Sequence, residues 1–261
     1  MDILEKIVRD KRKEVDLRKS IIPISQLENS VLCNRNKVSL AQALKNSATG
    51  IIAEHKRRSP SKSIINNNLN VQDVATGYES AGVCGMSVLT DGKYFGGSLD
   101  DLLVTRAAVQ LPLLRKEFVI DEYQILEAKA YGADVILLIA AILTRNEIKK
   151  LSEFAKKLDL DVLLEVHNEE ELHKSVMPSL DMLGVNNRNL KTFSVSLETS
   201  KSLASLIPND FVKVSESGIS SIEAIKELQP YGYLGFLIGE NFMKTENPGK
   251  SATNFIKSLV S

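Results

Sequence analysis

The sequence predicts an α/β protein in which eight β/α units close into a (β/α)8 TIM barrel, preceded by an extra N-terminal helical segment. Eight short apolar runs follow residue 50, helical stretches separate them, and 43% of the 261 residues are hydrophobic, enough for one sizeable core. An open, doubly wound sheet is the alternative, but no GxGxxG follows an early strand, which disfavours its dinucleotide-binding form. We expect one domain overall, with residues 1–49 as a helical extension packed on a barrel of residues 50–261.

The N-terminal segment begins with apolar side chains at helical spacing, which predicts an amphipathic helix lying on the barrel. Charges of both signs lie between them, which favours a solvated helix face over a nucleic-acid-binding patch. Residues 20–49 are polar and mixed, and we expect a connector with a second helix around 40–44. The apolar positions of the first helix are Ile3, Leu4, Ile7, Val8 and Val15.

The barrel prediction depends on eight strand candidates in chain order. Between them, stretches such as 121–132 and 144–158 suit helices. This alternation is typical of parallel β/α units, and eight of them are the number that closes a TIM barrel. The strand candidates are residues 50–56, 82–90, 111–118, 133–142, 161–167, 180–187, 211–218 and 235–240.

Composition limits the partners and the compartment. The formal net charge is +0, which gives no support for nucleic acid as a partner. No run approaches the ~20 apolar residues that span a bilayer, and the N-terminus lacks the apolar stretch of a signal peptide. We therefore expect a cytoplasmic protein without a membrane partner. Cys33 and Cys84 have no metal-ligand spacing and are expected to be reduced thiols with packing roles.

Polar side chains stand at the ends of several predicted strands, where a TIM barrel builds its active site. Read with a period of two, Ile52, Glu54 and Lys56 share one face of the first strand. A single buried Lys or Glu is usually a structural ion pair, but polar ends in five separate repeats favour a functional site. The other four strand-end residues are Lys116, Glu165, Asn186 and Glu216.

Two lysines and three glutamates in one barrel mouth predict acid–base chemistry. We expect the lysines to lower each other's pKa and burial to raise the pKa of the glutamates, which suits proton transfer near neutral pH. By strand parity, His55 and His167 point to the outer face, which disfavours a histidine-activated nucleophile. Metal ligation is also disfavoured, because lysine is a poor ligand and the carboxylates are not clustered with His.

Glycines follow the last two predicted strands. Gly218 and Gly239 stand at strand-to-helix turns, where backbone N–H groups at helix N-termini can bind phosphate. A tight turn explains either glycine alone equally well, but the two together favour a phosphorylated substrate. Ser59 could add a hydroxyl or simply start a turn before Pro60.

Eight stretches of the chain resemble one known family, indole-3-glycerol-phosphate synthase, in order and spacing. The resemblance covers essentially the whole chain, including a helix that the family lays over the barrel mouth. The stretches are "IIAEHKRRSPSK" (51–62), "LTDGKYFGGSL" (89–99), "LLRKEFVIDEYQI" (113–125), "GADVILLIAAIL" (132–143), "LLEVHNEEEL" (163–172), "GVNNRNL" (184–190), "VSESGI" (214–219) and "FLIGENFM" (236–243).

The resemblance implies ring closure of 1-(2-carboxyphenylamino)-1-deoxyribulose 5-phosphate to indole-3-glycerol phosphate, CO2 and water in tryptophan biosynthesis. No cofactor and no metal is implied. Lys116 would be the general acid that protonates the substrate ketone, and Glu165 would help the hydroxyl leave. Lys56 would hold the substrate carboxylate and share in dehydration, with Glu54 positioning it.

The resemblance also implies a binding set around these groups. Asn186 and Glu216 would hydrogen-bond substrate hydroxyls, and Arg188 would support that loop. The partner would be a small phosphorylated molecule, and the protein a monomer or weak homodimer. The remaining implied residues are Ser59, Ser217, Gly218, Gly239 and Glu240 for the phosphate, and Phe95, Phe118 and Leu137 for the benzene ring.

The sequence departs from the family pattern at a few positions. His55 replaces an apolar or aromatic residue, Ser63 a frequent Gly, and Gly96 a common Asn. Glu240 stands where some members have Ser, and we expect its carboxylate to turn away from the phosphate while its N–H donates. None of these changes removes a proposed catalytic group.

Three other functions compete with this reading. Phosphoribosylanthranilate isomerase needs a Cys and an Asp at strand ends, which this sequence lacks there. A Schiff-base aldolase would need a lysine that borohydride traps with substrate. A binding or scaffold protein without activity is disfavoured by the retained lysines and glutamates.

Overall fold

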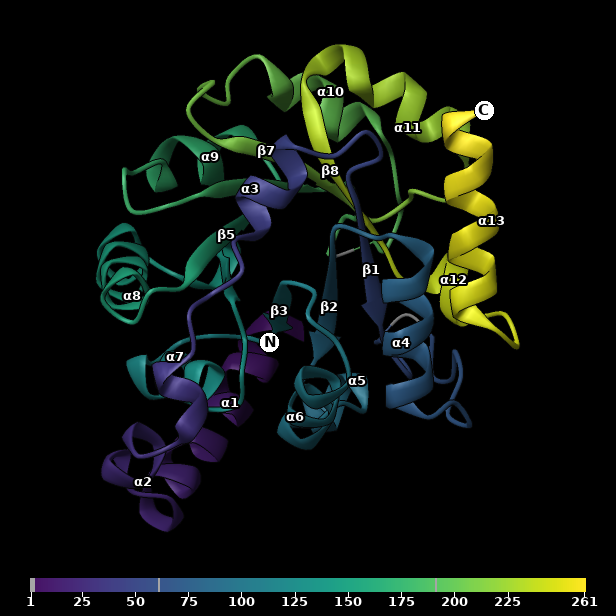
Figure 1. The fold of residues 1–261 in the computed structure, drawn as a ribbon. Coiled ribbons are helices and arrows are strands. Elements are labelled where there is room, and N and C mark those ends of the chain that lie inside the picture. Colours follow the sequence, from purple (N-terminus) through teal and green to yellow (C-terminus); the bar gives the residue numbers. More distant parts are fainter. Residues whose placement is uncertain (1–2, 61, 191) are drawn as a thin grey trace.

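The computed structural model describes residues 3–60, 62–190 and 192–261 (Figure 1). Eight parallel strands pair in chain order, and β8 pairs with β1, so the sheet is a closed barrel. The TIM barrel prediction is confirmed and the open sheet is wrong. The strands are β1 (Ile51–His55), β2 (Gly85–Leu89), β3 (Leu113–Lys116), β4 (Val135–Ile139), β5 (Asp161–Val166), β6 (Met182–Asn186), β7 (Val212–Glu216) and β8 (Tyr233–Ile238).

The strands are almost wholly buried because helices cover their outer face and side chains fill the inside. In β1, Ile51 and Ala53 belong to the outer hydrophobic cluster, whereas Ile52 belongs to the inner one. Leu114, from β3, shares the inner cluster with Ile52. The period-two prediction for the first strand therefore places Glu54 on the inner face.

Helices occupy the connections, and those that match the predicted stretches 121–132 and 144–158 are α7 and α8. Both begin with a capping box, from Asp121 with Gln124 and from Thr144 with Glu147. The helices are α1 (Ile3–Ile21), α2 (Ile24–Glu28), α3 (Leu40–Lys45), α4 (Val71–Ala81), α5 (Gly92–Phe95), α6 (Leu99–Ala108), α7 (Glu122–Ala130), α8 (Arg145–Lys157), α9 (Glu169–Ser175), α10 (Glu198–Ala204), α11 (Ile222–Leu228), α12 (Glu240–Met243) and α13 (Pro248–Val260), with short 3-10 turns η1 (Val31–Asn34), η2 (Ala140–Ile142) and η3 (Gln229–Tyr231).

Helix α1 packs against the barrel through a stripe that includes a lysine. Ile7, Lys11 and Val15 are its buried residues, one turn apart from each other. The prediction of a helix lying on the barrel is confirmed, but the solvated charged face is wrong at Lys11, whose side chain is 2% exposed. Its ammonium group lies 2.8 Å from Asp91 and 3.0 Å from Glu117.

The chain after α1 reaches the opposite end of the barrel. Helix α3 confirms the predicted second helix, and its buried Leu40 and Leu44 belong to the inner hydrophobic cluster. Arg35, in the connector, forms an ion pair with Asp134, which stands at the start of β4. The segment thus contacts both ends of the barrel, and its description as an extension separate from residues 50–261 stays a prediction.

The last helix covers the first β/α unit. Helix α13 lies beside α4 (Figure 1), and the two backbones approach so closely that a Cβ on Gly249 would lie 2.6 Å from Cα of Gly77. Together with the pairing of Ile51–Ala53 with Phe236–Ile238, this contact closes the ring. In the part of the chain that the structure describes, no helix is long and apolar enough to cross a membrane.

Candidate active site

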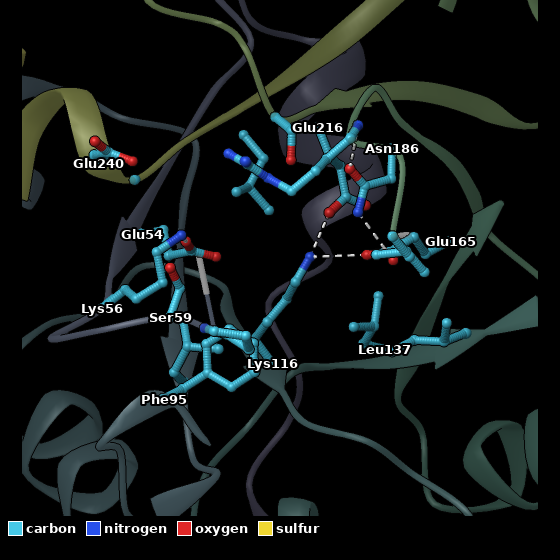
Figure 2. A pocket seen from close by; sticks show the side chains of 18 of the residues that line it. Glu54, Lys56, Ser59, Phe95, Lys116, Leu137, Glu165, Asn186, Glu216 and Glu240 are labelled. Carbon is cyan, nitrogen blue, oxygen red and sulfur yellow. Dashed lines mark hydrogen bonds and ion pairs between the residues drawn. The ribbon is translucent and has the colours of Figure 1, made fainter. Parts of the chain in front are cut away.

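A cavity of about 410 Å³ opens at the carboxyl ends of the barrel strands. All the site residues predicted from the sequence line it, and Figure 2 labels ten of them. The closed barrel therefore brings together side chains that lie far apart in the chain. The predicted residues that line the cavity are Glu54, Lys56, Ser59, Phe95, Lys116, Phe118, Leu137, Glu165, Asn186, Arg188, Glu216, Ser217, Gly218, Gly239 and Glu240.

Lys116, the last residue of β3, extends its ammonium group toward two carboxylates on the other side of the barrel (Figure 2). Its Nζ donates to Oε2 of Glu165 at 3.2 Å and to Oε2 of Glu216. Burial alone would lower the pKa of Lys116, but the attraction of Glu216, Glu165 and Glu54 outweighs it, and the pKa is raised. The predicted lowering by the second lysine is wrong, because carboxylates surround this ammonium group.

Glu54 and Lys56 form the second charged pair of the cavity. Nζ of Lys56 lies 2.6 Å from Oε1 of Glu54, and the hydroxyl of Ser87 donates to the other carboxylate oxygen at 3.4 Å. The carboxylate fits because residue 239 is glycine, whose added Cβ would lie 2.5 Å from Oε1. Burial raises the pKa of Glu54, but attraction by Lys56 and Lys116 outweighs burial and lowers it.

Glu165 accepts hydrogen bonds on both oxygens. Oε2 accepts from Lys116, and Oε1 accepts from Nδ2 of Asn186 at 3.1 Å. Burial of Glu165 would raise its pKa, but Lys116, His167 and Asn186 together lower it. The prediction that burial raises the glutamate pKa values is therefore wrong for Glu165, as it is for Glu54.

Glu216, the last residue of β7, differs from the other two carboxylates. Burial, followed by repulsion from Glu165 and Glu54, outweighs the attraction of Lys116 and raises the pKa of Glu216 to about 7. The prediction is confirmed here. At neutral pH this carboxyl group is partly protonated and can both donate and accept a hydrogen bond.

The loop after β6 is tied to the site through Asn186. Its Oδ1 accepts from the backbone N–H of Arg188 at 3.0 Å, while its Nδ2 donates to Glu165. The Arg188 side chain donates to the carbonyl of Phe193 at 3.2 Å, across the same loop. Phe193 has φ +59°, an uncommon conformation for a bulky residue, and lines the cavity.

The turns after β7 and β8 line the cavity next to each other. Ser217 and Gly218 have φ values of +66° and +79°, and Gly239 caps α12. The predicted helix N-terminus is wrong for Gly218, because α11 begins only after its cap Ser221. The Glu240 carboxylate lies 2.8 Å from Nζ of Lys62, which offsets its charge; that it turns away from a bound phosphate stays a prediction.

One wall of the cavity is apolar. The rings of Phe95 and Phe118 lie 5.9 Å apart between centroids, and Leu137 belongs to the inner cluster with Phe118. Further apolar lining residues were not predicted individually, and several of them come from α1 and from the loop after β6. These are Ile3, Leu4, Ile7, Leu190, Phe193 and Val195.

The two strand-end histidines lie in different surroundings. His55 is buried, does not line the cavity and has Arg57 and Asp101 as charged neighbours, as its predicted outward direction requires. His167 is different: its Nε2 lies 3.3 Å from Oε1 of Glu165. The predicted outward direction of His167 is wrong, because a period of two places it on the same face as Glu165, two residues earlier in the chain.

Two acidic lining residues were missed by the sequence analysis. Asp91 caps α5, and Glu117 follows Lys116 directly. Both pair with the buried Lys11, whose spacing from Ile7 and Val15 was the available signal. Among the residues described, no group of three or more His, Cys, Asp and Glu side chains is arranged to hold a metal ion. The absence of a metal and of a cofactor stays a prediction.

Comparison with known proteins gives one consistent family. The family model described as indole-3-glycerol phosphate synthase matches residues 4–255. A protein of that name from Bacteroides thetaiotaomicron is 48% identical over 258 residues, covering 99% of both chains. Another from Aliarcobacter butzleri is 40% identical, covering 98% of this chain and 99% of its own.

Solved structures similar to this one support the fold alone. KGPDC from Streptococcus mutans superposes with a TM-score of 0.63 at 12% identity, covering 82% of this chain and 98% of its own. A structure described as native KDPGal superposes with a TM-score of 0.59 at 11% identity.

Proposed function

The chain belongs to the indole-3-glycerol phosphate synthase family, and on that premise we propose how its cavity closes an indole ring. The protein is a decarboxylating lyase of tryptophan biosynthesis. It converts 1-(2-carboxyphenylamino)-1-deoxyribulose 5-phosphate to indole-3-glycerol phosphate, CO2 and water. The observation that carries the proposed mechanism is the position of Lys116 between Glu165 and Glu216 at the cavity surface.

Lys116 is the general acid of ring closure. The substrate ketone oxygen gains negative charge as the ring carbon attacks the ketone carbon, and the ammonium group stabilises that charge and donates its proton. Its raised pKa keeps Lys116 protonated at neutral pH, so that the proton is present when the ketone arrives. CO2 then leaves from the carbon that carried the substrate carboxylate, which restores the aromatic ring.

Glu165 serves the proton transfers of the dehydration step, in which the new hydroxyl group takes up a proton and departs as water while the adjacent ring carbon loses a proton. Its carboxylate lies beside both Lys116 and Asn186, which orient it toward the same substrate carbon. Lys56 holds the substrate carboxylate and shares in dehydration, and Glu54 fixes the Lys56 side chain through their 2.6 Å contact. Asn186 and Glu216 bind the substrate hydroxyls, and Arg188 supports the loop above them.

The two ends of the substrate match the two sides of the cavity. The backbone around Ser217, Gly218 and Gly239 receives the phosphate, together with Ser59 and the N–H of Glu240. The apolar wall of Phe95, Phe118 and Leu137 receives the benzene ring. The substrate is thus a small phosphorylated molecule; we further propose a cytoplasmic enzyme, a monomer or weak homodimer that binds neither nucleic acid nor membrane.

The reaction is tested by indole fluorescence. Because the chain contains no Trp, new indole emission stands out when the purified protein turns over the substrate. We expect Lys116→Ala to lower kcat by roughly 10²- to 10⁴-fold while the substrate still binds, the range for loss of a general acid. Lys149→Ala, at an exposed position of α8, is the matched control and should keep full activity. Near-normal turnover by Lys116→Ala would refute the role of Lys116.

A further inference from the structure

His167 bridges the cavity and the outer surface of the barrel. Its imidazole follows β5 directly, and the two ring nitrogens face different carboxylates. Nδ1 lies 3.0 Å from Oε2 of Glu171 on α9, at hydrogen-bond distance and angle, whereas Nε2 lies 3.3 Å from Oε1 of Glu165, at ion-pair distance but without the alignment of a hydrogen bond. The side chain is only 10% exposed, so water competes little for either contact.

The chemistry of these contacts decides the charge of the ring. A neutral imidazole has one donor and one acceptor nitrogen, and its acceptor would meet carboxylate lone pairs here. Electrostatic attraction to both carboxylates therefore requires a proton on both nitrogens. Burial lowers the pKa of His167, but Glu165 and Glu171 outweigh burial and raise it to about 10.

Glu171 is itself fixed in place. Its Oε2 accepts from the backbone N–H of His167 at 2.8 Å, and its Oε1 accepts from Nδ2 of Asn168 at 3.1 Å. Asn168 in turn caps α9 and accepts from the N–H of Glu171. The carboxylate that clamps the imidazole thus has little freedom to rotate.

The charged groups around the imidazole form a short line into the cavity. Glu171, from α9, and Glu165, from β5, are the charged groups that act on His167 in the described structure. Beyond Glu165 stand Lys116 and Asn186, which hold its other lone pairs. Among the described side chains that contact the Glu165 carboxylate, His167 is the one that does not line the cavity.

We propose that His167 is a positioning residue for catalysis: as an imidazolium cation clamped by Glu171, it fixes the Glu165 carboxylate in its orientation toward the substrate. This proposal rests on the proposed role of Glu165 in dehydration. It assigns Glu171, outside the cavity, to the same function. Figure 2 shows Glu165 in the orientation that this contact supports, with its carboxylate directed to Lys116 and Asn186.

Steady-state kinetics of two variants test the proposal. We expect His167→Gln to lower kcat by about 10- to 100-fold, as for loss of a residue that orients a reacting group, with KM changed less than about twofold. His173→Gln is the matched control. His173 and Glu169, both on α9, make a similar i,i+4 contact, but the side chain of His173 is 63% exposed. An unchanged kcat in His167→Gln would overturn the proposal.

The second variant, Glu171→Gln, gives a readout that a merely structural role would not change. Without one of the two carboxylates, the pKa of His167 falls from about 10 toward the ordinary 6.5. The cation is present below its pKa and lost above it, so kcat of this variant should fall as pH rises between about 7 and 9. Glu169→Gln should keep the wild-type profile. A Glu171→Gln profile that also matches wild type would contradict the proposal.

The ring charge is measured without any activity assay. Ring ¹⁵N shifts of the three histidines, with His167 assigned from the His167→Gln spectrum, should show titration near pH 10 in the wild type and lower in Glu171→Gln. Titration of His167 near its ordinary pKa of 6.5 in the wild type would overturn the proposal. This measurement does not depend on whether a variant folds. If Glu165→Gln keeps full activity while the clamp is observed, the role of Glu165 fails instead.

Discussion

One buried lysine, Lys11, and one partly buried lysine, Lys116, stand among carboxylates in this molecule, and the carboxylates around them differ in how fully they are satisfied. Around Lys11, Oδ1 of Asp91 accepts from the backbone of α5 and Oε2 of Glu117 accepts from Thr90. Oε1 of Glu117 lies 3.0 Å from the ammonium group, and Oδ2 of Asp91, which has no hydrogen-bond partner among the described residues, still lies 2.8 Å from it as an ion pair. Burial of Glu117 would raise its pKa, but Lys11 and Arg115 lower it. Each carboxylate in this group, including that of Glu14, therefore lies within ion-pair distance of Lys11.

Around Lys116, one carboxylate is left partly satisfied. Glu165 accepts on both oxygens, but Oε1 of Glu216 is buried without a hydrogen-bond partner among the described residues. Burial, followed by repulsion from Glu165 and Glu54, outweighs the attraction of the single ammonium group and raises the pKa of Glu216. We call the group around Lys11, in which each carboxylate contacts the lysine, the saturated cluster, and the group around Lys116, in which Oε1 of Glu216 has no partner among the described residues, the unsaturated cluster. The saturated cluster fixes α1 to the barrel, whereas the unsaturated cluster keeps an oxygen that can bind a substrate.

The largest expected effect concerns the saturated cluster. Lys11→Met leaves Asp91 and Glu117 buried without their cation, and we expect the free energy of unfolding to fall by about 3–5 kcal/mol. Urea unfolding monitored by circular dichroism measures the change. Lys13→Met, at an exposed position on α1, is the control. Equal unfolding free energies for Lys11→Met and Lys13→Met would show that the cluster around Lys11 does not stabilise the fold.

A somewhat smaller effect concerns the unsaturated cluster and pH. The folded-state pKa of Glu216 lies above its ordinary 4.5, so its stabilising contribution is present at low pH and is lost as pH rises from about 4.5 to 7. We expect a loss of up to about 3 kcal/mol in the wild type relative to Glu216→Gln. Urea unfolding of both proteins from pH 4.5 to 8 tests this. Parallel curves of unfolding free energy against pH for the two proteins would mean that folding does not raise the pKa of Glu216.

The smallest effect concerns the space that the unsaturated carboxylate occupies. A Cβ on Gly184 would lie 2.4 Å from Oε1 of Glu216, so Gly184→Ala must displace that carboxylate. We expect kcat/KM to fall by up to about 10²-fold with the fold retained. Gly92→Ala is the control, because its Cβ would make an ordinary 3.5 Å contact. Full activity of Gly184→Ala would show that the position of Glu216 is not critical.

Strand periodicity predicted much of this molecule because it describes regular backbone. It placed Ile52 and Glu54 inside the barrel and, through motif resemblance, collected the side chains that line one cavity. It also accounts for His167, because a period of two places this residue on the same face as Glu165, two residues earlier, and the predicted outward direction was wrong on this point. The contact between His167 and Glu165 agrees with that shared face.

The electrostatics could not be predicted in this way. Lys56 contacts one carboxylate and Lys116 two, although the sequence presents both lysines in the same way at strand ends. Which charges become neighbours depends on the order of strands around the ring and on side-chain reach. Lys11, by contrast, was open to prediction, since it stands one turn from both Ile7 and Val15.

Closure of the barrel has a consequence for synthesis on the ribosome. Strand β1 needs β8 as a neighbour, and α4 needs α13, whose residues are translated last among these elements. A nascent chain with seven of the strands made still has two unpaired strand edges and an uncovered apolar surface on α4. It must therefore wait, exposed to proteases and to other nascent chains, until the final helix emerges from the exit tunnel.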